Sequence, residues 1–140
     1  MASKIIKQNL ILASASKGRR NLLANSGLIF DVIPSRIDEA QLQSESHHLS
    51  LTEQSLLLAT KKAESVSVLH LDSIVIGGDQ ICGLGETIFN KPGNRENAKA
   101  QLLQLSGQTH QLYTAICLFK NSQLVWSTVE TAHMTMRSLT

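Results

Sequence analysis

The stretch that most constrains the fold of this 140-residue chain covers residues 10–20, with the sequence LILASASKGRR. Its apolar residues end abruptly at Ser14 and Ser16, and paired arginines follow a single glycine. The pattern predicts a buried strand, a tight turn and the first turn of a helix. Hydroxyl groups, free backbone N–H groups and guanidinium groups at the start of a helix are suited to binding phosphate. The segment therefore predicts an α/β unit that carries an anion site.

Composition and charge exclude several classes of protein. A hydrophobic content of 42% fits a globular domain, and no apolar run approaches the ~20 residues that span a bilayer. The N-terminus has no secretory signal pattern, so we expect a cytoplasmic protein with no membrane partner. The net charge of +2 comes from scattered cations, and aromatic residues make up only 4%, which argues against nucleic-acid binding. Cys82 and Cys117 stand far apart, and we expect two buried thiols rather than a zinc site or a disulfide.

The predicted elements mix strands and helices along the whole chain. Residues 35–49 are polar and irregular and predict a loop, and Ser50 with Glu53 forms a capping-box pattern at the start of a helix. Because a strand-rich domain would be expected to continue beyond the last predicted strand, we expect a single domain over 1–140 that lacks its C-terminal part. The predicted strands cover 5–13, 28–33, 74–76 (ending at the glycine pair 77–78), 109–119 and 124–136, a hairpin covers 81–89, and the helices cover 17–26, 50–66 and 94–105.

Two acidic residues are candidates for chemistry. Asp79 follows the apolar run 74–76 and a pair of glycines, so we expect it at the end of a strand, where backbone can approach a ligand closely. Glu39 follows the strand predicted at 28–33. Taken singly, Glu39 is better explained as a solvated residue, whereas for Asp79 an ordinary turn aspartate is the weaker alternative. Two carboxylates at neighbouring strand ends could hold Mg²⁺ together with substrate phosphates, and one of them could accept a proton from water.

Three lysines can be separated by their positions. On the helix that begins after Ser50, Lys61 projects away from the apolar face and Lys62 lies at its flank. Lys62 could reach into a cleft or extend along the surface to water. Lys91 precedes Pro92 and is a candidate phosphate contact in an extended segment or turn. The residues that define the apolar face are Leu56, Ala59, Ala63 and Val66.

Several short motifs recur in one order along the chain, and together they resemble the Maf family of nucleoside triphosphate pyrophosphatases. The opening LILASASKGRR resembles the family's LASxSxxRR signature. The resemblance covers essentially the whole chain through IDE (37–39), LATKKA (58–63), GGDQ (77–80), Lys91-Pro92, LSG (105–107) and YTA (113–115).

The resemblance implies an α/β fold with a twisted, elongated mixed sheet flanked by helices, similar to inosine triphosphatases, with a cleft between two lobes. It implies a house-cleaning hydrolase of nucleotide metabolism that uses Mg²⁺ or Mn²⁺ to convert a nucleoside triphosphate into the monophosphate and pyrophosphate. By motif match, Asp79 is the catalytic base, and Glu39 and Asp79 hold the metal. The implied substrate-binding residues are Ser14, Ser16, Arg19, Glu39, Lys62 and Lys91.

Departures from the family pattern bear on specificity. Lys17 and Gly18 replace the proline and the arginine or aromatic residue common in the signature, and Gly18 lacks a side chain where base selection is expected. Gln80 after Asp79 resembles the branch associated with 7-methyl-GTP rather than the branch associated with dTTP and UTP. Two alternatives stay open: a non-catalytic nucleotide-binding protein linked to cell division, and an inactive truncated fragment. A homodimer is also left open.

Overall fold

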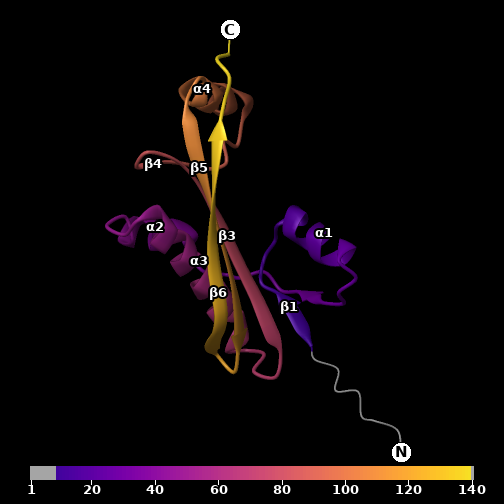
Figure 1. Cartoon of the computed structure of the whole chain (residues 1–140). Coiled ribbons are helices and arrows are strands. Elements are labelled where there is room, and N and C mark those ends of the chain that lie inside the picture. Colours follow the sequence, from indigo (N-terminus) through magenta and orange to yellow (C-terminus); the bar gives the residue numbers. More distant parts are fainter. Residues whose placement is uncertain (1–8, 140) are drawn as a thin grey trace, which may run out of the picture.

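The computed structural model of the chain describes residues 9–139, and within that range six strands and four helices form one mixed sheet with flanking helices (Figure 1). None of these helices has the length and apolarity that crossing a membrane requires. In chain order the elements are β1 (Leu10–Leu12), α1 (Lys17–Asn25), β2 (Asp31–Val32), α2 (Glu39–Glu45), α3 (Leu51–Ser67), β3 (Ile74–Leu84), β4 (Thr87–Phe89), α4 (Arg95–Leu105), β5 (Thr109–Lys120) and β6 (Gln123–Thr135).

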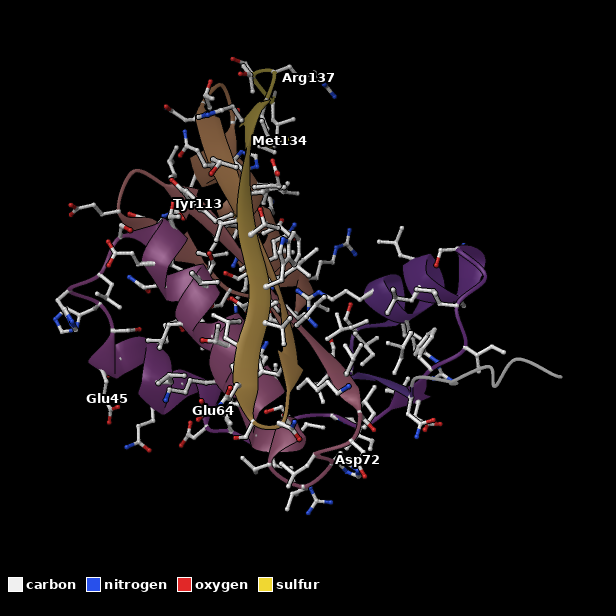
Figure 2. The ribbon with its side chains drawn as sticks, turned by 60° about the horizontal axis from the view of Figure 1, so that its bottom comes forward. Glu45, Glu64, Asp72, Tyr113, Met134 and Arg137 are labelled. Atoms are coloured by element: carbon white, nitrogen blue, oxygen red, sulfur yellow. The ribbon has the colours of Figure 1, made fainter. Side chains whose placement is uncertain are left out.

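The sheet has the strand order β2-β1-β3-β5-β6, with β4 paired to β3 beside this path. The short strands β1 and β2 are parallel to each other, and β1 is also parallel to β3. The long strands β3, β5 and β6 are antiparallel and give the sheet its elongated shape. In two views α1 lies on one side of these long strands, and α2 and α3 lie on the other (Figures 1 and 2). The α/β fold with an elongated mixed sheet is as predicted.

Helix α3 packs against β3 and β5 through the face that the sequence predicts. Ser50 caps the helix, and its Oγ accepts a hydrogen bond from the Glu53 N–H at 3.1 Å. Ala59, Ala63 and Val66 are buried in the core, with Leu56 packed against it. A Cβ at Gly77 would lie only 2.5 Å from the Ala59 carbonyl oxygen, so the glycine is what allows helix and strand to approach this closely.

Two predicted boundaries are wrong, and each has a physical reason. Residues 35–49 are not all loop, because α2 forms at Glu39–Glu45, where the Asp38 side chain accepts a hydrogen bond from the Gln41 N–H at 3.0 Å. The strand at 74–76 does not end at the glycine pair. The strand continues to Leu84. Gly77 does not end it: the glycine lies inside the strand because α3 packs too closely there for a side chain.

Smaller differences concern the N-terminal strands and the cysteines. Of the strand predicted at 5–13, residues 5–8 lie outside the described residues and Leu10–Leu12 forms β1. The strand predicted at 28–33 is reduced to Asp31–Val32. Cys117 is buried, and this burial raises the pKa of its thiol to about 11, whereas Cys82 is only half-buried. Cys117 thus serves as a small core residue next to Gly77.

Candidate active site

Lys62 joins two carboxylates that come from different parts of the chain. It lies at the flank of α3, and its Nζ is 2.5 Å from Glu39 Oε1 and 3.0 Å from Asp79 Oδ1. The Lys62 side chain is 13% exposed, and the Asp79 side chain is 11% exposed. Of the two alternatives predicted for Lys62, the structure excludes extension along the surface to water: the amino group is turned into a polar cluster.

Asp79 lies in the middle of β3, opposite Ala115 of β5, and not at a strand end as predicted. Its carboxyl group is buried, and Oδ2 has no hydrogen-bond partner among the described residues. Burial raises the pKa of Asp79 above its ordinary value, and the nearby Glu39 charge adds to this, while Lys62 and, to a smaller extent, Arg19 act in the opposite direction. A buried carboxylate with a raised pKa and a free oxygen is equipped to accept a proton.

The turn between β1 and α1 brings a second cation, Arg19, toward Asp79. Ser16 caps α1, and its Oγ accepts a hydrogen bond from the Arg19 N–H at 3.3 Å. Ser14 Oγ accepts from the Ser16 N–H at 3.1 Å and from Arg19 Nη1 at 3.2 Å. A Cβ at Gly78 would lie 3.2 Å from Arg19 Nε, so the guanidinium group passes beside the residue that precedes Asp79. Arg19 is close enough to lower the pKa of Asp79, but it approaches β3 from the face on the side of α1, opposite to α3.

The two residues predicted to select the base are both solvent-exposed. Gly18 lies in the first turn of α1. Gln80 points to the other face of the sheet from Asp79, as neighbouring residues of a strand do. Its Nε2 donates a hydrogen bond to Thr114 Oγ1 at 2.9 Å. Sequence reasoning missed Thr114, although the motif YTA contains it, because the pairing of Gln80 with Thr114 depends on the register of β3 and β5.

Lys91 is a predicted phosphate contact that the structure does not bring to this cluster. It lies in a separate hollow of about 320 Å³ between β4 and α4, together with Asn90 and Asn97. Within residues 9–139 no ion pair or hydrogen bond joins it to Glu39, Lys62 or Asp79. A role for Lys91 in binding phosphate stays a prediction.

The carboxylates fit a divalent cation that shares its coordination with a substrate. In residues 9–139 no group of three or more His, Cys, Asp and Glu side chains could hold a metal alone. Asp79 Oδ2 is unpartnered, and Glu39 is the other carboxylate that pairs with Lys62. Mg²⁺ typically takes one or two protein carboxylates plus phosphate oxygens and water. Glu39 and Asp79 could supply the two carboxylates of such a set.

The fold places the chain in the class of α/β proteins built on a long, twisted mixed sheet. It matches a solved HAM1 protein from Coxiella burnetii with a TM-score of 0.53, at 12% identity over 91% of this chain and 71% of that chain. It matches the Ham1 protein of Staphylococcus aureus with a TM-score of 0.52, at 17% identity over 91% and 70%. At these identities the likeness concerns the fold alone.

The chain belongs to the Maf family, because the family model described as Maf-like protein matches residues 9–140. A Bradyrhizobium diazoefficiens protein named nucleoside triphosphate pyrophosphatase is 46% identical over 133 residues, which cover 95% of this chain and 66% of that protein. A Rhizobium meliloti protein named 7-methyl-GTP pyrophosphatase is 43% identical over 136 residues, covering 96% and 68%. The chain thus spans about two thirds of the length of these relatives, and the resemblance predicted from the motifs is confirmed.

Proposed function

We propose that this protein hydrolyses a nucleoside triphosphate to the nucleoside monophosphate and pyrophosphate. The observation that carries the proposal is Asp79: a buried carboxyl group with a raised pKa, one oxygen held by Lys62 and the other without a partner. Membership of the Maf family and the names of the relatives support the same reaction. We place this activity in the cytoplasm, where the nucleotide pool is found.

In the proposed reaction, Asp79 acts on the attacking water and the cations around it act on the phosphates. Asp79 Oδ2 accepts a proton from water as the water oxygen bonds to the α-phosphorus. The bond from that phosphorus to the oxygen bridging to the β-phosphorus breaks, and pyrophosphate leaves with the electron pair. Arg19, with Ser14 and the N-terminus of α1, binds the negative charge of the phosphates. Lys62 keeps the carboxylate of Asp79 in place.

We also propose that Glu39 and Asp79 hold a divalent cation, Mg²⁺ or Mn²⁺, together with the phosphates. Such a cation would offset triphosphate charge and polarise the phosphorus–oxygen bonds. The closeness of both carboxylates to Lys62 and the largely exposed side chain of Glu39 support this part of the proposal.

For the base, we propose 7-methyl-GTP as the preferred substrate. Gln80 follows the catalytic carboxylate and is held by Thr114, and relatives named 7-methyl-GTP pyrophosphatase are 43% and 39% identical to this chain. The test is pyrophosphate release with Mg²⁺ over a panel of 7-methyl-GTP, GTP, dTTP and UTP. We expect the highest kcat/KM for 7-methyl-GTP. Binding of nucleotides without hydrolysis of any of them would favour a non-catalytic nucleotide-binding protein.

A further inference from the structure

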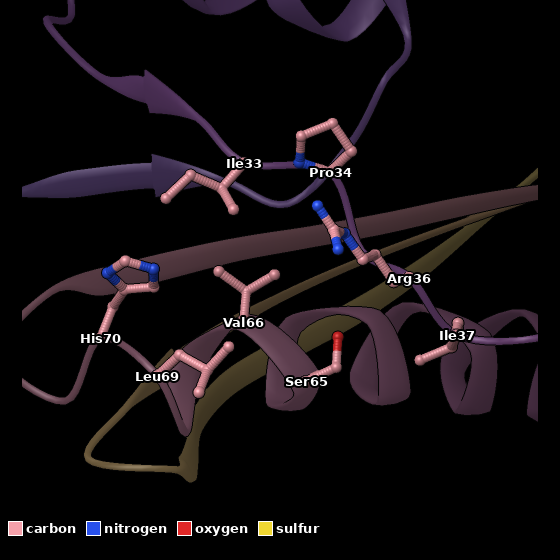
Figure 3. Close-up of a pocket in the computed structure, with 8 residues that line it drawn as sticks. All are labelled: Ile33, Pro34, Arg36, Ile37, Ser65, Val66, Leu69 and His70. Carbon is pink, nitrogen blue, oxygen red and sulfur yellow. The ribbon is translucent and has the colours of Figure 1, made fainter.

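A second cavity lies beside the candidate active site and is separate from it. It has a volume of about 470 Å³ and opens between the segment that follows β2 and the end of α3 with the turn that follows it (Figure 3). Ile33, Val66 and Leu69 provide apolar walls, and Arg36 and His70 provide the main polar groups. The volume is in the range of small-molecule sites. None of the residues proposed to bind the triphosphate lines it.

The charges around this cavity are of one sign. Figure 3 shows the Arg36 side chain turned toward the space between Pro34 and α3, with His70 at one end. Within residues 9–139 the Arg36 guanidinium has no hydrogen bond or ion pair, and no acidic residue lines the cavity. An unpaired guanidinium beside apolar walls favours an anion, because its planar N–H groups match a carboxylate in two parallel hydrogen bonds.

The amount of charge indicates which anion. A nucleoside triphosphate requires several cations and a metal, as at the active site, whereas this cavity offers one guanidinium and one imidazole. Most of its wall is apolar side chain, including Leu69, which is 77% exposed. A ligand that covers this surface and pairs with Arg36 needs an apolar body and a single negative charge.

We propose that this cavity binds a small molecule with an apolar body and one carboxylate, and that the ligand acts as an effector of the active site. Two short links connect the cavity to the catalytic cluster. Ser65 Oγ lies 3.1 Å from Ser35 Oγ and donates to the Lys62 carbonyl oxygen at 2.7 Å. A ligand between Arg36 and α3 reinforces this connection, which holds the segment leading to Glu39 against the helix turn of Lys62.

Binding is tested with phenylbutyrate, with its amide phenylbutyramide as the uncharged counterpart, by methyl and amide NMR of the whole chain. We expect millimolar phenylbutyrate to shift the signals of Ile33, Val66 and Leu69, and the amide to bind at least tenfold more weakly. Arg36→Gln should weaken the binding of phenylbutyrate by the same factor. Arg137→Gln, which removes an exposed arginine elsewhere, should leave this binding unchanged. Leu69→Asn tests the apolar wall without altering the guanidinium.

The outcomes separate this proposal from the proposed function. Equal binding of acid and amide, unchanged binding to Arg36→Gln, or no shifts at these methyl groups would overturn it. Displacement of phenylbutyrate by 7-methyl-GTP would overturn the claim of a second site. The effector role rests on the proposed hydrolysis and predicts that phenylbutyrate changes KM for the nucleotide in the wild type but not in Arg36→Gln. Binding is measured without turnover, so a failure of hydrolysis leaves the binding test intact.

Discussion

The two carboxylates that share Lys62 are positioned in opposite ways. Asp79 lies inside β3, where it pairs with Ala115 of β5, and its carboxyl group is buried and contacts Lys62 of α3. Glu39 begins a helix of seven residues, its side chain is 56% exposed, and it contacts the site through the ion pair to Lys62. Tight packing therefore fixes one carboxylate, whereas a single charged contact holds the other.

This difference separates two kinds of task. A proton acceptor must keep its position and its raised pKa, and both depend on burial. A ligand for a metal–nucleotide complex must be reachable from solvent, and an exposed glutamate meets that need. Because Glu39 is largely exposed and Lys62 keeps its ion pair with Asp79, Glu39 can exchange Lys62 for a cation at little cost to the fold.

The largest expected effect is on turnover when the buried carboxylate is neutralised. Asp79→Asn keeps the size of the side chain but removes the proton acceptor, and we expect kcat to fall by about 10²–10⁴-fold. Steady-state pyrophosphate release measures this. Glu130→Gln, an exposed carboxylate on β6, is the matched control and should retain wild-type turnover.

The glycine pair before Asp79 offers the sharpest test of the packing of α3 against β3. A Cβ at Gly77 meets the backbone oxygen of Ala59 at 2.5 Å and the Ala63 Cβ at 2.7 Å, so Gly77→Ala should destabilise the fold by roughly 1–3 kcal/mol. A Cβ at Gly78 meets the flexible Arg19 side chain at 3.2 Å and the Ala115 backbone oxygen at 3.4 Å, which is ordinary contact distance. Gly78→Ala should therefore leave the free energy of unfolding nearly unchanged and weaken nucleotide binding. Denaturant unfolding of both variants measures their free energies of unfolding, and equal losses of stability would contradict the account.

Neutralising the exposed carboxylate should have a milder effect that depends on metal concentration. Glu39→Gln removes one proposed ligand, so we expect turnover to fall at limiting Mg²⁺ and to recover partly at saturating Mg²⁺. Its free energy of unfolding should change by no more than about 1 kcal/mol. Metal titrations of activity, together with unfolding curves, measure both quantities. A large loss of stability would show that Glu39 is a structural residue.

The smallest effect expected is on how stability depends on pH in the metal-free protein. The pKa of Asp79 is raised above its ordinary value of 3.8, so the folded state binds this proton more tightly than the unfolded chain does. Its contribution to stability is complete below 3.8 and is lost as the pH rises through the raised pKa. Unfolding curves in EDTA should show this decline in the wild type and a weaker one in Asp79→Asn. Parallel pH profiles for the two proteins would contradict the raised pKa.

Much of the packing of α3 against β3 could be predicted from the sequence because its signals are local. The spacing of Ala59, Ala63 and Val66 predicts the buried face of α3, and Ser50 with Glu53 predicts where that helix begins. The continuation of β3 through Gly77 could not be predicted, since glycine pairs commonly end strands and the reason for this pair lies in a helix that comes earlier in the chain.

The exposed helix α2, which carries Glu39, is harder to predict because its sequence signals are weak. Helix α2 has seven residues and no buried side chain, so it lacks the apolar periodicity that predicts longer helices. The sequence does single out Glu39, Lys62 and Asp79. The bridge that Lys62 makes between the two acids depends on the distance between a helix and a strand, which spacing along the chain does not contain.

The most direct test of the central claim is the identity of the products that this protein forms from 7-methyl-GTP and Mg²⁺, followed by phosphorus NMR. The account predicts equal amounts of nucleoside monophosphate and pyrophosphate, formed by the wild type and lost in Asp79→Asn. Release of orthophosphate with the nucleoside diphosphate, or wild-type turnover by Asp79→Asn, would contradict it.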